Sequence, residues 1–226
     1  MNMNADFSLR VVLHGAAMAW MDSPVAGVQR RMLDRIGDEV ARATTIVRYA
    51  RGSQFTAHTH GGGEEFIVLE GVFQDEHGDY PPGSYVRNPP SSRHTPGSAQ
   101  GCIIFVKLWQ FAPEDRTHVI VDMNKMGKIG DRLRRGVAVT PLFEDERETV
   151  QLEYWEPDAQ VQLTYPDGAE LLVLAGDFRD AGDHLHSMSW MRLPCGGQLD
   201  ALAGQQGARV WVKQRHLRFV DPPMVP

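Results

Sequence analysis

The chain of 226 residues has very little cysteine, no excess of positive charge and no long apolar run. Its two cysteines, Cys102 and Cys195, are too few for a disulfide framework and form no CxxC motif, so a reducing compartment is expected. The formal net charge of -6 argues against a nucleic-acid-binding protein, which usually presents a basic face to phosphates. No apolar run approaches the length of a membrane-spanning helix. These absences predict a protein that binds neither nucleic acid nor membrane.

The stretch VVLHGAAMAW, from Val11, faintly resembles a secretory signal with its cleavage site. However, His14 interrupts the apolar run, and Asp6 stands where a signal sequence carries positive charge. We therefore expect a cytoplasmic protein.

Helical periodicity is also scarce, and short β-branched runs bounded by Gly, Pro, Asn and Asp take its place. Examples are TTIVRYA, EFIVLEGVF, CIIFVKLWQF, TVQLEYW, ELLVLAGDF and RVWVKQRHL. Runs of this kind are typical of strands in an antiparallel sandwich or barrel. The sequence therefore predicts an all-β fold.

Two parts of the chain resemble each other at a constant offset. EEFIVLEGVFQDEHGD, from Glu64, matches AELLVLAGDFRDAGD, from Ala169. Further equivalent pairs follow at the same offset or one residue later: Gly71 and Gly176, Asp75 and Asp180, Tyr85 and Trp190, Arg87 and Arg192, Lys107 and Lys213. This repeat predicts two similar β domains, which we place at residues 1–124 and 125–226.

The first domain contains a pattern of potential metal ligands. His58 and His60 stand at i and i+2, so on a strand both imidazoles project from the same face. Glu64 follows a run of three glycines and opens the next strand, and His94 follows a turn-forming NPPSSR segment. Three imidazoles and one carboxylate suit a borderline divalent ion such as Zn, Fe, Mn or Ni.

These segments also resemble a known family. HTHGGGEEFIVLEG, at residues 58–71, resembles the first cupin motif, and GSYVRNPPSSRH resembles the second, with Ser91 in place of the usual Gly and Ser98 in place of the usual Asn. More closely, residues 48–108 resemble the cupin half of ChrR-type zinc anti-sigma factors. The resemblance implies a bicupin of two tandem antiparallel jelly-roll barrels. It also implies zinc as the metal, held by His58, His60, Glu64 and His94.

The resemblance does not extend to the helical module that carries anti-sigma activity in ChrR-type proteins. That module holds its own His/Cys zinc site, whereas this sequence begins a few residues before its β structure and has no His-plus-CxxC cluster. We therefore do not expect this chain to bind a sigma factor.

The internal repeat separates residues of the fold from residues of the metal site. At the positions of the four candidate ligands, the second domain has residues that are poor metal ligands: Leu163, Tyr165, Ala169 and, at the position of His94, Leu199. We expect the second domain to bind no metal. Glu65, by contrast, matches Glu170 and is expected to support the fold or an interface. A second HxH motif, formed by His184 and His186, has no following Glu. We therefore expect these two histidines to be exposed residues of a loop.

Two functions remain open from the sequence. One is a sensor, regulatory or small-ligand-binding cupin, and the alternative is a metal-dependent dioxygenase or related small-molecule enzyme. Tyr49 and Glu70 are the nearby candidates for a general base, and we expect Glu70 to be exposed. A homodimer through edge strands is also expected, from four apolar residues: Trp109, Phe111, Trp211 and Phe219.

Overall fold

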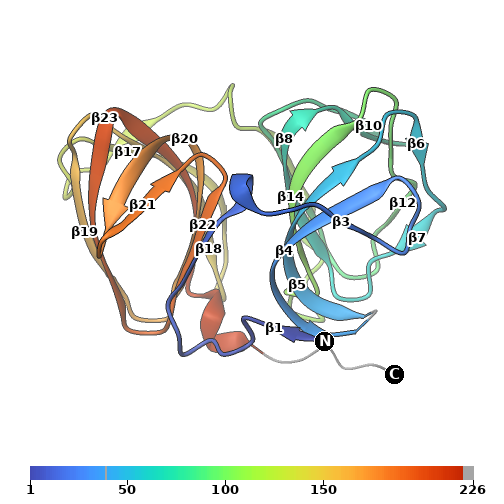
Figure 1. Cartoon of the computed structure of the whole chain (residues 1–226), viewed down its shortest axis with the longest axis horizontal. Helices are drawn as coiled ribbons and strands as arrows, with labels where there is room; N and C mark the ends of the chain where they lie inside the picture. The colour runs from blue at the N-terminus through green and yellow to red at the C-terminus, as the bar shows by residue number, and fades with distance from the viewer. Residues whose placement is uncertain (39, 221–226) are drawn as a thin grey trace. The chain divides into compact units, whose positions relative to one another are not determined.

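The computed structural model describes residues 1–38 and 40–220, which form two compact β units (Figure 1). The first comprises Met1–Ala5 and Ala19–Asn124, and the second comprises Asp6–Met18 and Lys125–Val220. The helices of the described residues are two short 3-10 segments, η1 (Gly15–Ala17) and η2 (His216–Phe219). The all-β prediction is confirmed. In the described part of the chain, no helix has the length and apolarity to cross a membrane.

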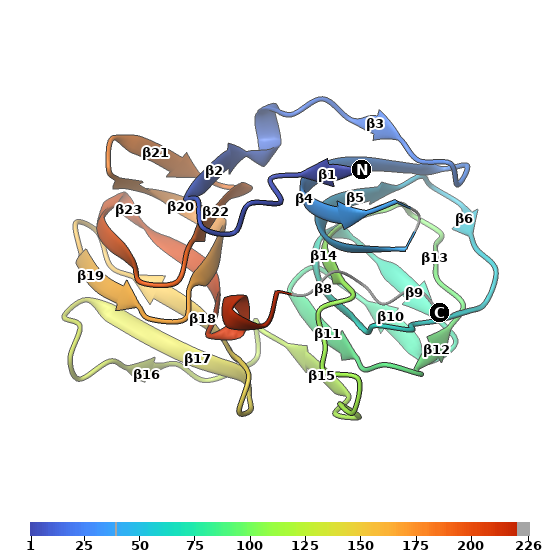
Figure 2. The same cartoon turned by 90° about the horizontal axis from the view of Figure 1, so that it is seen from below.

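The first unit is built from three antiparallel sheets (Figure 2). The largest runs in the order β1 (Asn2–Met3), β4 (Val28–Gly37), β5 (Ala41–Tyr49), β14 (Cys102–Leu108), β8 (Glu64–Gly71), β11 (Ser84–Asn88) and β15 (Val119–Asp122), with β3 (Met21–Asp22) beside β4. A smaller sheet runs in the order β10 (Gly78–Tyr80), β9 (Phe73–Asp75), β13 (Gly97–Ser98) and β6 (Ser53–Gln54). The third sheet pairs β7 (His58–Thr59) with β12 (Arg93–His94).

The second unit is built around one nine-stranded antiparallel sheet. Its order is β16 (Ile129–Gly130), β17 (Val137–Glu144), β18 (Thr149–Trp155), β23 (Gly197–Gln214), β20 (Ala169–Asp180), β22 (Ser189–Leu193) and β2 (Val11–His14). In addition, β19 (Gln160–Tyr165) pairs with β23, and β21 (Asp183–His186) pairs with β20.

The segment Asp6–Met18 lies with the second unit, although the division predicted from the sequence assigned it to residues 1–124. Its strand β2 pairs with β22, where Val11 faces Arg192 and His14 faces Ser189. So short a strand pairs with whichever sheet edge is open, and that edge can be far away in the sequence. The four residues of β2 therefore do not predict its partner strand.

The internal repeat corresponds to matching backbone geometry in the two units. Gly71 and Gly176 both have φ of 69°, in the left-handed region that favours glycine. A Cβ on either would lie 2.0 Å from a carbonyl oxygen, that of Gly101 for Gly71 and that of Gly207 for Gly176. Both glycines are therefore required by the same left-handed backbone and the same close approach to a neighbouring strand, β14 for Gly71 and β23 for Gly176.

Buried charged residues occupy equivalent positions in the two units. In the first unit Glu65 pairs in register with Arg87 and with Lys107, and the Tyr85 hydroxyl donates a hydrogen bond to Glu65 over 2.6 Å. In the second unit Glu170 pairs likewise with Arg192 and Lys213, and the Trp190 indole N–H donates to Glu170 over 3.1 Å. Glu65 thus belongs to a network that also exists around Glu170.

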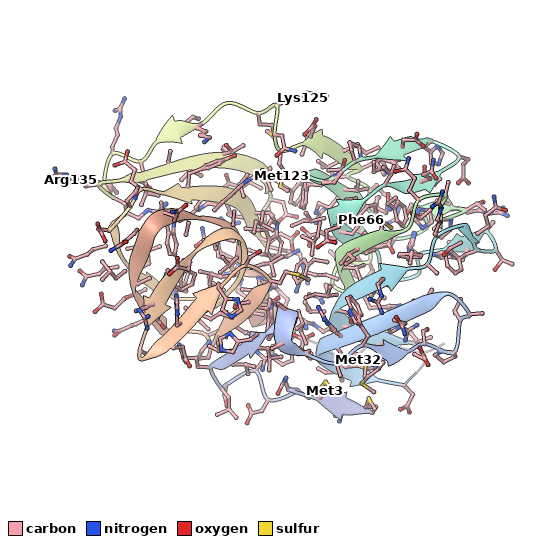
Figure 3. The ribbon with its side chains drawn as sticks, turned by 45° about the horizontal axis from the view of Figure 1, so that its top comes forward. Met3, Met32, Phe66, Met123, Lys125 and Arg135 are labelled. Carbon is pink, nitrogen blue, oxygen red and sulfur yellow. The ribbon has the colours of Figure 1, made fainter. Side chains whose placement is uncertain are left out.

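The interior of the first unit is apolar around one face of β8. Phe66, labelled in Figure 3, packs with Val68, Phe73 and Cys102 in the core. Burial raises the pKa of the Cys102 thiol to about 11, so Cys102 is a protonated, inert core residue.

The three-glycine turn between β7 and β8 is shaped by two aromatic side chains. A Cβ on Gly62 would lie 2.4 Å from the Trp109 indole, and a Cβ on Gly63 would lie 2.4 Å from the Phe111 ring. The Trp109 backbone N–H also donates to the Gly63 carbonyl over 3.1 Å. Trp109 and Phe111, expected from the sequence to serve a dimer edge, therefore pack against this turn, and the homodimer remains a prediction.

The contact between the turn and Trp109 predicts a stability loss for Gly62→Ala. The added methyl would meet the rigid body of the indole, and overpacking of this kind costs roughly 1–3 kcal/mol. Gly127→Ala is the matched control, because a Cβ at Gly127 meets nothing within 4 Å. Urea unfolding monitored by tryptophan fluorescence measures the difference, and equal stability of the two variants would show that the turn does not depend on Trp109.

Candidate metal centre

The pairing of β7 with β12 places two histidines opposite each other. His58 and His94 are direct antiparallel partners in this two-stranded sheet. The backbone of His60 continues the pairing, since its N–H donates to Ser92 and its carbonyl accepts from Ser91, each over 2.9 Å. Ser91 has φ of 72°, so the serine that replaces the usual glycine of the motif keeps the left-handed backbone of a tight turn.

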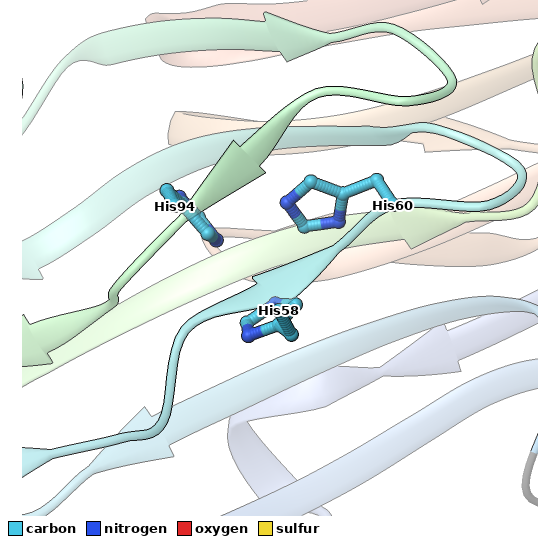
Figure 4. A group of neighbouring side chains, drawn as sticks. All are labelled: His58, His60 and His94. Atoms are coloured by element: carbon cyan, nitrogen blue, oxygen red, sulfur yellow. The ribbon is translucent and has the colours of Figure 1, made fainter.

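The three imidazoles converge on one point (Figure 4). One ring nitrogen from each of His58, His60 and His94 lies within 4.8 Å of the others, and the ring centroids are 4.7 to 5.0 Å apart. His60 and His94 are buried, whereas His58 is exposed. Among the described residues these three form the group of potential metal ligands, and they could hold a metal ion.

Glu64 lies at the same point as the histidines. Its Oε2 is 3.5 Å from Nε2 of His60 and 3.6 Å from Nε2 of His94. The Asn88 side-chain amide donates to the same oxygen over 3.2 Å, and His118 Nε2 lies 2.8 Å from the Asn88 oxygen. All four residues predicted from the sequence are thus brought together, and a polar chain from Glu64 through Asn88 ends at His118.

Asp75 orients His94 from the side away from the cluster. Its Oδ2 is 3.2 Å from Nδ1 of His94, so Nε2 of His94 is directed toward Glu64. Burial lowers the pKa of His94, but the hydrogen bond to Asp75 and the charges of Glu64 and Asp75 outweigh it and leave that pKa raised. A carboxylate behind a ligating histidine is a common device for fixing the ring and its tautomer.

The state of His60 fits a site for a cation. Its Nε2 is buried and has no hydrogen-bond partner among residues 1–38 and 40–220. Burial lowers the pKa of His60, and the neighbouring imidazoles add to the effect against the opposing charge of Glu64. A neutral imidazole whose buried ring nitrogen has no hydrogen-bond partner, beside a carboxylate, suits ligation of a divalent transition metal ion.

A cavity of about 720 Å³ in the first unit reaches the candidate metal centre. His58, His60 and Glu64 form part of its lining, and Tyr49 and Trp109 are among the other lining residues. A cavity of this size accommodates a small organic molecule. Glu70 is exposed, as expected, and lies outside the cavity lining, so Tyr49 is the one of the two general-base candidates that lines the cavity.

The second unit repeats the strand pairing without the ligands. Leu163 of β19 faces Leu199 of β23, as His58 faces His94. Leu163 packs against a core that contains Tyr165, Ala169 and Leu199, so apolar packing fills the equivalent position. His184 and His186 are exposed, as predicted, but they lie on strand β21, and the prediction of a loop was wrong.

Three residues of the site were not predicted from the sequence: Asp75, Asn88 and His118. Asp75 matches Asp180 in the repeat and so resembled a residue of the fold, and His118 stood alone. An i, i+2 or motif spacing could not have found them, because each comes from a different part of the chain.

Known families and structures agree with this architecture. The family model of the ChrR cupin-like domain matches residues 8–112, and no curated protein matches the chain. Among solved structures, a Nostoc punctiforme protein provisionally described as a dioxygenase has 16% identity and a TM-score of 0.77, and the match covers 97% of this chain and 87% of that one.

Two Escherichia coli proteins are also similar in structure. YlbA has 14% identity and a TM-score of 0.70, and the match covers 96% of this chain and 94% of that one. The bacterial pirin YhhW, solved in complex with nickel(II), has 12% identity and a TM-score of 0.63, over 91% of this chain and 98% of that one. Residues 8–112 of this chain thus match a ChrR-type cupin domain, and the similarity to these solved structures shows a common fold.

The contact between Asp75 and His94 predicts that Asp75→Asn weakens metal binding. The amide removes the charge that orients the imidazole, and losses of about 10- to 100-fold in affinity are typical for such residues. Asp180→Asn is the matched control, because Asp180 is the equivalent residue of the second unit and binds Arg10 over 2.9 Å. Competition titration with a chromophoric chelator measures both affinities, and an equal effect of the two substitutions would contradict the assignment.

Metal affinity is expected to fall as the solution becomes more acidic. Imidazole ligands must be neutral, and the raised pKa of His94 means that protons compete for it at a higher pH than for an ordinary histidine near 6.5. Binding isotherms between neutral pH and about pH 5 test this, since an unperturbed imidazole is mostly protonated at the lower value. Unchanged occupancy over that range would count against imidazole ligation.

Proposed function

We propose that the first unit binds one divalent transition metal ion through His58, His60, Glu64 and His94, and that a small organic molecule in the adjoining cavity reaches that ion. One observation supports the proposal most strongly: three of these four residues also line the cavity, so a molecule in the cavity would lie next to the ion. A site with a purely structural ion would need no such access.

The donor set favours a borderline divalent ion. Three imidazoles and one carboxylate suit zinc, iron, manganese or nickel, and the resemblance to ChrR-type domains favours zinc. A bound ion would supply Lewis acidity, and a redox-active ion such as iron would also support oxygenase chemistry. Four protein ligands leave room on a six-coordinate ion, whereas they complete the coordination of a tetrahedral zinc.

The surrounding residues prepare the site for such an ion. Asp75 fixes the His94 ring, and the Asn88 amide holds Oε2 of Glu64. Glu64 supplies the negative charge that compensates part of the charge of a cation. Tyr49 lines the cavity, and burial, with the charge of Glu64 in addition, raises its pKa, so its hydroxyl remains neutral and able to donate a hydrogen bond to a ligand.

The use of the bound molecule distinguishes two functions. In a small-ligand sensor or regulatory cupin, occupation of the cavity would change the protein without converting the ligand. In a metal-dependent dioxygenase, the ligand would be oxidised. The cavity suits both functions. The fold shared with the provisional dioxygenase of N. punctiforme supports the second, and the match to the ChrR cupin-like model supports the first.

Elemental analysis of protein purified without a chelator or an affinity tag tests the metal site. We expect about one ion per chain in the wild type, and loss of that ion in His58→Ala and His94→Ala, because each removes an imidazole donor. His186→Ala is the control, since it removes one exposed histidine of the second HxH, on strand β21. Retention of the ion in both site variants would contradict the proposal.

Oxygen uptake by the iron-loaded protein with simple ketones and phenols distinguishes the two functions. Turnover that is absent in His94→Ala would support the dioxygenase. About one zinc per chain with ligand binding but no uptake would support the sensor.

A further inference from the structure

The cavity beside the metal centre contains a charged residue that the metal site does not explain. Arg30 lies on β4, paired in register with Val47 of β5, and its side chain lines the cavity. The guanidinium is half-buried, and burial, with the charge of Arg35 in addition, lowers its pKa. An arginine nevertheless remains charged in a protein, so this part of the cavity wall carries a fixed positive charge.

Among residues 1–38 and 40–220, no hydrogen bond or ion pair engages the Arg30 guanidinium. Arg35, which also lines the cavity, donates instead to backbone carbonyls, from Nε to Gly37 over 3.2 Å and from a terminal nitrogen to Asp38. Arg30 therefore offers unused donors toward the cavity, where burial of an uncompensated charge is costly.

The internal repeat indicates that the fold does not require an arginine at the position of Arg30. In the first unit Val28 faces Tyr49 and Arg30 stands two residues further along β4. In the second unit Val137 faces Trp155, and the residue two positions further along β17 is Val139. The strand thus tolerates an apolar residue at this position, and the arginine is present in the unit that also contains the histidines and Glu64.

The rest of the wall is mostly apolar. Five of its apolar side chains come from the neighbouring strands β4, β5 and β14: Val28, Val47, Ile104, Val106 and Leu108. A molecule that fills this space must present an apolar body to these residues and a negative charge to Arg30. A guanidinium binds a carboxylate through paired hydrogen bonds, which makes a carboxylate the matching group.

We propose that the cavity binds a small organic acid with an apolar body, whose carboxylate pairs with Arg30 while its other end faces the metal centre. This inference rests on the proposed function for the position of the ion, but the interaction with Arg30 does not require the ion. A ligand held in this way binds in one orientation, because its carboxylate pairs with Arg30 and its other end faces the metal centre. Arg30 is thereby the residue that determines which class of molecule is bound.

Isothermal titration with 4-phenylbutyrate and its neutral amide tests the assignment, in zinc-loaded and in metal-free protein. We expect the wild type to bind the acid at least about 10-fold more tightly than the amide in both forms, the scale of one charged hydrogen-bonding pair. Arg30→Met should abolish the preference, and Arg30→Lys should retain part of it. Arg51→Met, which removes an exposed arginine outside the cavity lining, should leave it unchanged.

Equal binding of acid and amide by the wild type, binding of neither at millimolar concentration, or a preference that survives in Arg30→Met would overturn the inference. Metal content is measured on the same samples, so that failure of the Arg30 interaction can be distinguished from failure of the metal site. Arg30→Met with wild-type zinc content is a folded protein, and Val139 at the equivalent position of the second unit indicates that the fold accepts the change. A preference in metal-free protein together with no stoichiometric metal would remove the proposed function alone.

Discussion

The antiparallel pairing of two very short strands, β7 and β12, controls the candidate site. It sets His58 opposite His94, and the continuing hydrogen bonds between His60 and the Ser91–Ser92 turn hold the third imidazole beside them. Side chains alternate between the two faces of a strand, so a shift of one residue in this pairing would turn His94 away from the cluster. The left-handed backbone of Ser91 and the glycine turn packed on Trp109 both serve to keep that register.

The second unit has the same strand arrangement but lacks these ligands. Its corresponding pair, Leu163 and Leu199, contributes to the apolar core, and the unit retains the buried Glu170 network and the left-handed backbone at Gly176. The architecture therefore does not depend on an ion. What the first unit adds is four potential ligands and an arginine that lines the cavity. The two units share the carboxylate at Asp75 and Asp180, but Asp75 orients His94, whereas Asp180 binds Arg10.

Much of this could be predicted from the sequence because it is local or repeated. The HxH spacing, the following Glu64 and the distant His94 form a pattern that can be recognised from the sequence alone. The internal repeat identified Glu65 as a residue of the fold. The contacts of Asp75, Asn88 and Trp109 could not be predicted, because they depend on register between strands that are far apart in the chain. The same holds for β2, whose position was decided by an open sheet edge rather than by its own four residues.

Anomalous diffraction from crystals of the zinc-loaded protein, collected on both sides of the zinc absorption edge, locates a bound ion directly. If three histidines and one glutamate of the first unit hold one ion, a single strong peak will lie within coordination distance of His58, His60, Glu64 and His94, with Asp75 still bonded to the far nitrogen of His94. A peak at His184 and His186, or no peak at the three-histidine cluster, would rule out this metal site.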